Sequence, residues 1–462
     1  MDRKWRALLI VCVAIFMLLL DITVVNVALP DIQRELHTSF TDLQWVVDAY
    51  ALLLATCVLI AGTAGDWLGR KRVFIGGVVL FTVASALCGA ATSPLFLNLA
   101  RGLQGVGGAV MFAVSLAILS QEFQGRERGT AFGIWGATIG AAVAIGPLVG
   151  GALTEWAGWR WIFFVNLPIG AICVFGALAY LHESRDERHA GFDLPGFAFL
   201  TGGLFSLVLA LLRGNDWGWG SGKTLGLFIA ALVLLVAFVV SQLRNASPMF
   251  DMTLFRKPSF AGAQIIAFTI SAAMFSQFLF LTLYLQNQLH FTPLQAGLRF
   301  LPLSLVSFVA APISGRLSAR IPMRILLGTG MGLVALALVL MRGITPSSHW
   351  TTLLPGFILG GIGVGMVNPP LASTAVGVVD PRRAGMASGI NNTFRQVGIA
   401  TGIAGLGAIF QSNVHGSDRA AFVSGLNEIL LVGAFVALAG AIAAVALVRG
   451  RDFVRMPQPG EA

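Results

Sequence analysis

One carboxylate, Asp21, lies late in the first long apolar run of this sequence, within FMLLLDITVVNVALP at residues 16–30. An ionisable side chain at membrane depth costs about 3 kcal/mol or more, so it is retained chiefly where it faces a protected, wet interior. A carboxylate in that setting can take up and release a proton. Asp21 is therefore predicted to be the proton-carrying group of a transporter.

Arg101 is the predicted partner of Asp21. At 1.5 Å per residue, Asp21 lies roughly 12 Å and Arg101 roughly 9 Å below the predicted outer edge of their apolar runs. These depths favour an ion pair that keeps Asp21 ionised until substrate or a conformational change separates the two groups. A static structural ion pair is the alternative. Asn26 is expected to add a hydrogen bond to Asp21, and Gln104 is placed with Asn26 among residues of the substrate cavity.

Asp48 is the other acid at depth, roughly 7 Å below the outer edge of the second run. It is grouped with Asp21 and Arg101 in proton coupling, where it would accept a second proton. Two other readings stay open: Asp48 binds a cationic substrate, or it reaches the membrane interface and is simply solvated.

The loop GTAGDWLGRKRV at residues 62–73 has the composition of a gate. Gly65 and Gly69 allow a tight turn, and Asp66 could cap a helix N-terminus in the opposite half, where the helix dipole favours a carboxylate. That contact, together with Arg70, would hold the cytoplasmic side shut. The alternative is that the three cations at residues 70–72 only set membrane topology.

Glycine and proline recur at the end of the fifth run, in Gly146, Pro147, Gly150 and Gly151. Small residues let membrane helices approach closely, and proline allows bending.

The second half of the chain replaces acids at depth with amides and one arginine. Gln264, Gln277, Asn391 and Arg395 are predicted to line the substrate cavity, and Asn391 and Arg395 share one helix face at i, i+4. Hydrogen bonding between helices with no role in transport is the alternative.

Composition identifies a polytopic membrane protein. The 462 residues are 56% hydrophobic and 11% charged, with a mean hydropathy of +0.82, whereas soluble domains carry roughly 25% charged residues. The net charge of +9 is better explained by cytoplasmic cations than by nucleic-acid binding. The sequence has no GxxxxGK[ST] loop for ATP, no metal-ligand spacing and no catalytic Ser/His/Asp set, so we expect a transporter rather than an enzyme.

Fourteen helical spans are predicted, because helices satisfy the backbone in lipid. They cover residues 7–29, 44–62, 73–92, 95–119, 129–153, 160–181, 195–213, 224–242, 259–286, 295–315, 325–342, 352–377, 386–411 and 427–448. Twenty-one of the 30 Lys and Arg residues fall on one side of these spans and seven on the other, which predicts that both termini are cytoplasmic. The spans divide into an N-terminal six-helix bundle (1–183), an inserted helix pair with linkers (184–257), and a C-terminal six-helix bundle with a tail (258–462).

These motifs resemble the major facilitator superfamily, and most closely its 14-span drug:proton antiporter branch, the EmrB/QacA type. The resemblance rests on LDITVVNVALP (20–30), GDWLGRKR (65–72), RGLQGVGGA (101–109), GPLVGG (146–151), WRWIFFVNLPIG (159–170) and AGMASGINNTFRQVGIATG (384–402). The second-half copy of the gating loop departs from the first by carrying Arg316 in place of Asp66.

The resemblance implies an all-α major facilitator fold and roles for the residues above. Asp21 and Arg101 would couple protons, Asp66 and Arg70 would gate the inner side, and Gly146 and Pro147 would form an exporter motif. The expected function is proton-coupled multidrug or antibiotic efflux by alternating access, with symport, or export of one metabolite, as the alternative.

We expect a monomer in a bacterial cytoplasmic membrane that uses the proton gradient and no cofactor. Its expected partners are protons, the lipid bilayer and a small lipophilic, drug-like substrate, for which a cationic charge is one option.

Overall fold

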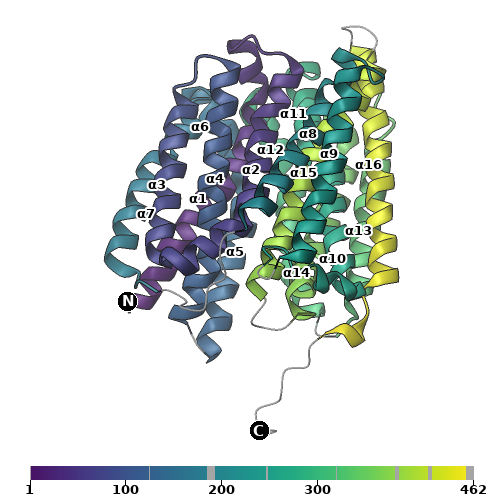
Figure 1. Ribbon diagram of the computed structural model, residues 1–462. Helices are drawn as coiled ribbons and strands as arrows, with labels where there is room; N and C mark the ends of the chain where they lie inside the picture. Colours follow the sequence, from purple (N-terminus) through teal and green to yellow (C-terminus); the bar gives the residue numbers. More distant parts are fainter. Residues whose placement is uncertain are drawn as a thin grey trace.

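The computed structural model describes residues 2–123, 125–184, 193–245, 248–318, 320–379, 384–414 and 419–453. Every regular element in these ranges is helical, as the composition predicted. The helices run along one common direction, and α1 begins at the same end of the molecule at which α16 finishes (Figure 1).

The first part of the chain holds seven helices. They are α1 (Arg3–Glu35), α2 (Phe40–Leu68), α3 (Arg70–Gly89), α4 (Pro94–Glu122), α5 (Gly125–Ala157), α6 (Trp161–Phe164) and α7 (Asn166–Tyr180). Two more, α8 (Leu194–Trp217) and α9 (Gly222–Arg244), pack on each other, and α8 also contacts α2 and α15.

The remainder begins with the short η1 (Met252–Arg256). It continues with α10 (Pro258–Ile270), η2 (Ser271–Phe275), α11 (Gln277–Leu283), η3 (Tyr284–Gln288), α12 (Pro293–Leu317), α13 (Met323–Met341), η4 (Trp350–Leu353), α14 (Leu354–Gly377), α15 (Ala384–Asn413), α16 (Arg419–Leu447) and η6 (Gly450–Asp452).

Twelve helical segments in the described part of the chain are long and apolar enough to cross a membrane. Two other long helices, α5 with 33 residues and α15 with 30, include residues whose side chains lie outside the described part. The count of fourteen spans stays a prediction, and so do the bundle boundaries at residues 183 and 257.

Two helices that the sequence predicted as continuous are interrupted. The predicted span 160–181 breaks at Val165 between α6 and α7, because Pro168 has no N–H to bond the carbonyl four residues earlier. The predicted span 259–286 contains two π-helical turns, η2 and η3, each closed by an i→i+5 hydrogen bond such as Ser276 N to Ser271 O at 3.2 Å. Each π-helical turn contains one more residue than an α-helical turn, and it therefore changes the direction in which the following side chains point.

Glycines let α4 lie directly against its neighbours. A Cβ on Gly105 would stand 2.4 Å from the Tyr50 carbonyl of α2, and one on Gly107 would stand 2.6 Å from the Phe81 amide of α3. Backbone contact at this distance is possible only for a residue without a side chain. This close packing places the polar residues of α4 beside α1 and α2.

The N-terminal helices meet the C-terminal helices along α5 with α12, α2 with α15, and α1 with α11. Three hydrogen bonds join them at the ends of the helices predicted to face outside. They run from Gln44 to the Ile403 carbonyl (2.8 Å), from Gln286 to the Val27 carbonyl (2.6 Å), and from the Leu294 amide to Glu155 (3.0 Å). The two halves are therefore closed against each other at that end.

We predict that Gly105→Ala lowers the apparent melting temperature of the purified protein. The added methyl group would overlap the Tyr50 carbonyl, and overpacking of this kind costs about 1–3 kcal/mol. Gly226→Ala in α9 is the matched control, because a Cβ there meets nothing within 4 Å. Equal melting temperatures for the two variants would contradict the predicted helix contact.

Candidate functional site

Asp21 of α1 and Arg101 of α4 form a buried ion pair. Arg101 Nη1 lies 2.5 Å from Asp21 Oδ2, and the side chains are 1% and 0% exposed for Arg101 and Asp21 respectively. The compatible depths inferred from the sequence are thus confirmed as a contact. At a membrane site, two opposite charges at this distance offset much of the cost of removing each from water.

Amide side chains complete the shell around the Asp21 carboxylate. Gln104 Nε2 donates to Asp21 Oδ1 at 2.8 Å, and Asn166 Nδ2 of α7 donates to the same oxygen at 3.1 Å. Both amides also donate to Ser85 Oγ of α3, at 3.2 and 2.9 Å. Four helices of the N-terminal half therefore contribute to one hydrogen-bonded group.

Arg101 is held from both sides. Its Nε donates to the Val46 carbonyl at 2.9 Å, and its Nη1 also donates to Gln104 Oε1 at 2.6 Å. The guanidinium carbon lies 4.3 Å from the centroid of the Tyr50 ring, a cation–π distance. The arginine is positioned independently of Asp21, so a proton on the carboxylate would weaken the pair without freeing the arginine entirely.

Asp48 of α2 is fully buried, and neither carboxylate oxygen has a hydrogen-bond partner among the described residues. It shares a helix face with Gln44 and Ala55, at i−4 and i+7. Both of these bond to α15: Gln44 to the Ile403 carbonyl, and the Ala55 carbonyl to Thr393 at 2.8 Å. Asp48 therefore lies in the α2–α15 interface, and the reading in which it is solvated at the membrane interface is wrong for this conformation.

The loop predicted over residues 62–73 is wrong in extent: residues 62–68 are the end of α2, residues 70–73 are the start of α3, and only Gly69 lies outside a helix. Gly69 adopts φ of 107°, a left-handed conformation that glycine tolerates. Glu183, which follows α7, accepts hydrogen bonds from the amides of Lys71 (3.1 Å) and Arg72 (3.3 Å) at the start of α3. The Arg70 amide donates to the Ser184 carbonyl at 2.9 Å.

An acid does cap a helix N-terminus here, but it is Glu183 from the same half of the chain. The side chain of Asp66 lies outside the described residues, so its predicted contact with the opposite half stays a prediction. The packing at Gly65 is described: a Cβ there would stand 2.9 Å from Val114 of α4.

The glycines of the predicted exporter motif lie where α5 meets α1 and α12. Cβ atoms on Gly146 and Gly150 would overlap Thr23 and Val24 of α1, and one on Gly151 would stand 2.6 Å from the Pro293 carbonyl of α12. The Pro147 carbonyl in turn lies 2.3 Å from the position of a Cβ on Gly297. The motif thus joins the two halves through direct backbone contact.

Two of the predicted cavity residues bond within their own half. Gln277 donates to the Ile429 carbonyl of α16 at 2.9 Å. Asn26 donates to the Ile22 carbonyl at 3.1 Å, so the hydrogen bond to Asp21 that the sequence suggested is wrong; the position is taken by Asn166.

The other amides and the arginine of the second half lie around α15. Asn391 Nδ2 donates to Gln264 Oε1 of α10 at 3.1 Å, and Arg395 Nη2 donates to Asn368 Oδ1 of α14 at 2.7 Å. Arg395 is half-buried. The polar wall predicted for this helix is present, although Asn391 and Arg395 bond to different neighbours.

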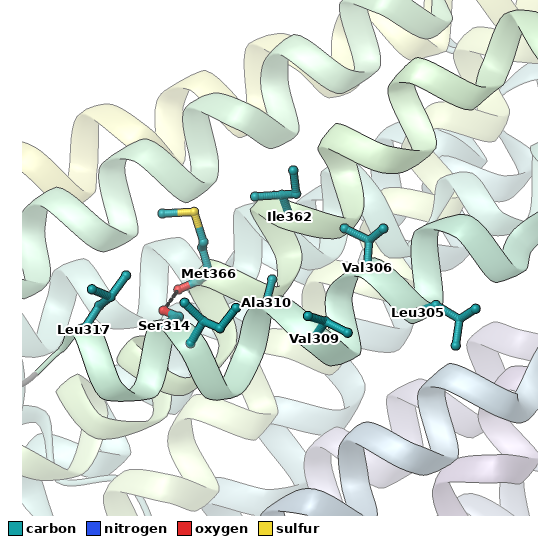
Figure 2. A pocket seen from close by; sticks show the side chains of 9 residues that line it. Leu305, Val306, Val309, Ala310, Ser314, Leu317, Ile362 and Met366 are labelled. Atoms are coloured by element: carbon teal, nitrogen blue, oxygen red, sulfur yellow. Dashed lines mark hydrogen bonds between the residues drawn. The ribbon is translucent and has the colours of Figure 1, made fainter.

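A groove of about 460 Å³ is lined by residues of the packed helices α12 and α14 (Figure 2). Its lining is apolar and includes Leu305, Val309, Ile362 and Met366. Ser314, also in the lining, donates from Oγ to the Met366 carbonyl at 2.7 Å. The groove shares no residue with the Asp21 group.

Sequence reasoning missed Ser85, Asn166, Tyr50 and Glu183 as members of these sites. A signal existed for Asn166, which lies inside the motif WRWIFFVNLPIG, and for Tyr50, which lies two residues after Asp48. Ser85 and Glu183 carry no local pattern that separates them from other polar residues. Among the described residues, no group of three or more His, Cys, Asp or Glu side chains is placed to hold a metal ion.

A bundle of long apolar helices with a buried ion pair between the first and fourth is the architecture of a membrane transporter. The sequence profile of the Major Facilitator Superfamily matches residues 11–403. The chain therefore belongs to the Major Facilitator Superfamily, and it is a multi-pass transporter rather than an enzyme.

Curated relatives match most of the chain. It is 39% identical to the multidrug resistance protein Stp of Mycobacterium tuberculosis, over 86% of this chain and 74% of that protein. It is 36% identical to the puromycin resistance protein pur8 of Streptomyces alboniger, over 100% and 93%. It is 34% identical to the tetracenomycin C resistance and export protein of Streptomyces glaucescens, over 89% and 77%.

A solved structure shares the fold. The bacterial homologue of the human lysosomal transporter Spinster, in an inward-facing and unoccupied conformation, superposes with a TM-score of 0.68 at 16% identity. The match covers 98% of each chain.

We predict that Asp21→Asn lowers the melting temperature of the purified protein, because Arg101 then keeps a buried charge without its counter-ion. Breaking such a pair costs about 3–5 kcal/mol. The double variant Asp21→Asn with Arg101→Met should recover part of this loss, since both charges are removed. A double variant whose loss of stability equals the sum of the losses of the two single variants would show that the residues do not interact.

Proposed function

We propose that this protein is a proton-coupled efflux transporter for small drug-like or antibiotic compounds. It exports its substrate by alternating access, with protons moving inward. The observation that carries the proposal is the ion pair of Asp21 with Arg101, 1% and 0% exposed for arginine and aspartate, within a shell of amide donors. Relatives named for multidrug resistance, puromycin resistance and tetracenomycin C export support efflux of this class of compound.

The geometry suggests how a proton would act on Asp21. In the unprotonated state the carboxylate accepts hydrogen bonds from Arg101, Gln104 and Asn166. Protonation removes the charge and one acceptor site. The attraction between α1 and α4 then falls, and helices held by that pair can rearrange as the two halves rock.

Further proposals concern the membrane. We place fourteen spans in a bacterial cytoplasmic membrane, counting α5 and α15 with the twelve helical segments named above, and both termini in the cytoplasm. The lengths of α5 and α15, 33 and 30 residues, support this count. The start of α1 and the end of α16 at one end of the molecule support an even number of crossings (Figure 1).

We predict that Asp21→Asn abolishes proton-driven efflux. Purified protein in liposomes with an imposed pH gradient should expel ethidium when wild type, and the variant should lose at least about 90% of this rate, because an amide cannot carry the proton. Glu428→Gln, which replaces an exposed acid near Arg342, is the matched control. Normal, gradient-dependent efflux by Asp21→Asn would show that Asp21 is not the carrier.

We further propose that Asp48 is neutral whenever α2 is closed against α15. An ionised carboxylate sealed without a partner would cost several kcal/mol, and protonation avoids that cost. Among the charged groups on the surrounding helices, Arg101 of α4 pairs with Asp21, and Arg213 of α8 pairs with Asp42 at 3.7 Å. Arg395 of α15 bonds to Asn368 and makes no contact with Asp48, whose two oxygens have no partner among the described residues. Closure of this interface would therefore require a proton on Asp48.

We predict that rising pH opens the α2–α15 interface in the wild type but not in Asp48→Asn. The closed state is stabilised while Asp48 is protonated and loses that stabilisation as the acid ionises, whereas asparagine stays neutral. Spin labels at Leu95→Cys and Ser412→Cys, both exposed, would report the change as a distance distribution. A wild-type distribution that does not change with pH, or one that changes equally in the variant, would contradict the role of Asp48.

A further inference from the structure

We propose that Asn392 and Arg395 form an anion-binding wall on α15. This wall would bind an acidic oxygen group, such as a carboxylate, enolate or phenolate, on an otherwise apolar substrate. The inference rests on the proposed efflux function and names the chemistry of its cargo.

A stripe of half-buried residues follows one face of α15. Ser388, Asn392, Arg395 and Ile399 are spaced i, i+4, i+7 and i+11, and each is partly exposed. This spacing places them one above another on an α-helix.

Contacts on either side show where this stripe points. On one side Thr393 donates to the Ala55 carbonyl of α2, in the N-terminal half. On the other side Asn391 donates to Gln264 of α10, and Arg395 to Asn368 of α14, in the C-terminal half. The stripe lies between these contacts, so it faces the interface between the two halves, where transporters of this architecture bind substrate.

Arg395 keeps an unneutralised charge at this place. Its one hydrogen bond in the described part of the chain goes from Nη2 to the neutral amide of Asn368, at 2.7 Å. Nε and Nη1 make no hydrogen bond there, and they are not sealed from solvent. No carboxylate of the described residues lies within ion-pair distance of the guanidinium.

Asn392, one helical turn away, adds a second unused donor. Its Nδ2 is buried and has no hydrogen-bond partner among the described residues. A buried donor without a partner costs about 1–3 kcal/mol, which an acceptor on a bound molecule would offset.

Arg395 carries a positive charge and offers only donors, and Asn392 Nδ2 adds a buried donor without a partner among the described residues. A guanidinium recognises two oxygen atoms in a plane, and its hydrogen bonds to an anion are stronger than those between neutral groups. A cationic group would be repelled at the same place. Apolar neighbours such as Ile399 can take the carbon skeleton of the substrate.

A purely structural arginine would behave differently. A structural role, in which Arg395 links α15 to α14, needs only the one hydrogen bond to Asn368. Loss of that bond would disturb the packing of the helices and weaken the binding of every ligand equally. Recognition of an anion affects acidic ligands selectively. The ratio of affinities for an acid and for its neutral ether therefore separates the two roles.

The test uses the full-chain protein in detergent and equilibrium dialysis at neutral pH. The probes are 2-hydroxy-1,4-naphthoquinone, which is ionised, and its neutral ether 2-methoxy-1,4-naphthoquinone. We expect the wild type to bind the acid about 10- to 100-fold more tightly than the ether, as charge-assisted hydrogen bonds allow. Arg395→Met should reduce this ratio to about one, whereas Arg395→Lys, which keeps the charge, should retain part of it.

Two more variants complete the test. Asn392→Ala should lower the affinity for the acid severalfold and leave that for the ether unchanged. Arg299→Met, which removes an arginine stacked on Phe291 elsewhere, should keep the wild-type ratio. Affinities are compared only between variants that are monodisperse and that melt at the wild-type temperature. If Arg395→Met does not meet this condition, Arg395→Lys and Asn392→Ala provide the test.

The inference is overturned if the wild type binds the acid no more tightly than the ether, or if Arg395→Met keeps the ratio. Ethidium efflux from liposomes is measured in parallel. If the wild type shows no preference for the acid but still exports ethidium, only the inference about the anion-binding wall is contradicted. A wild type that keeps the acid preference but moves neither ethidium nor 2-hydroxy-1,4-naphthoquinone against a pH gradient contradicts the efflux proposal instead.

Discussion

The interior of this molecule is organised by the need to keep charge inside a membrane. Asp21 and Arg101 would each be expelled from hydrocarbon alone, and together they form a pair less than 2% exposed. The pair is tolerable because further hydrogen bonds are made around it, by Gln104, Asn166 and the backbone of Val46. This hydrogen-bonded network is stable when Asp21 is ionised and loses stability when Asp21 is protonated. Proton coupling needs a group with this property.

The glycine-rich helices serve that network. The side chain of Arg101 reaches α1 and α2 because α4 packs against α2 through backbone contact at Gly105. Glycines of α5 do the same between the two halves, where Gly151 meets Pro293. Direct backbone contact leaves little room for gradual deformation, so a change at this interface separates whole helices rather than bending them.

The two halves of the chain divide the chemistry between them. The N-terminal half holds the paired charges, while the C-terminal half presents Arg395 without a carboxylate in the part of the chain that the structure describes. In the proposed mechanism, this asymmetry separates proton handling from contact with cargo. Asp48 lies in the α2–α15 interface between the halves. In the proposed mechanism, its protonation therefore depends on whether this interface is closed.

Sequence alone was sufficient for the all-helical class of fold and for the Asp21–Arg101 pair, because burial in lipid restricts both of these locally. A long apolar run must be helical, and two opposite charges at equal depth favour each other wherever their helices meet. It could not supply Asn166, Ser85 or Glu183, since their roles depend on which helices become neighbours. Only the tertiary structure brought α3 and α7 beside α1 and α4, turned Asn26 toward its own backbone, and placed the open face of α15 between the two halves. Those outcomes depend on close packing between distant segments, which no local pattern of residues records.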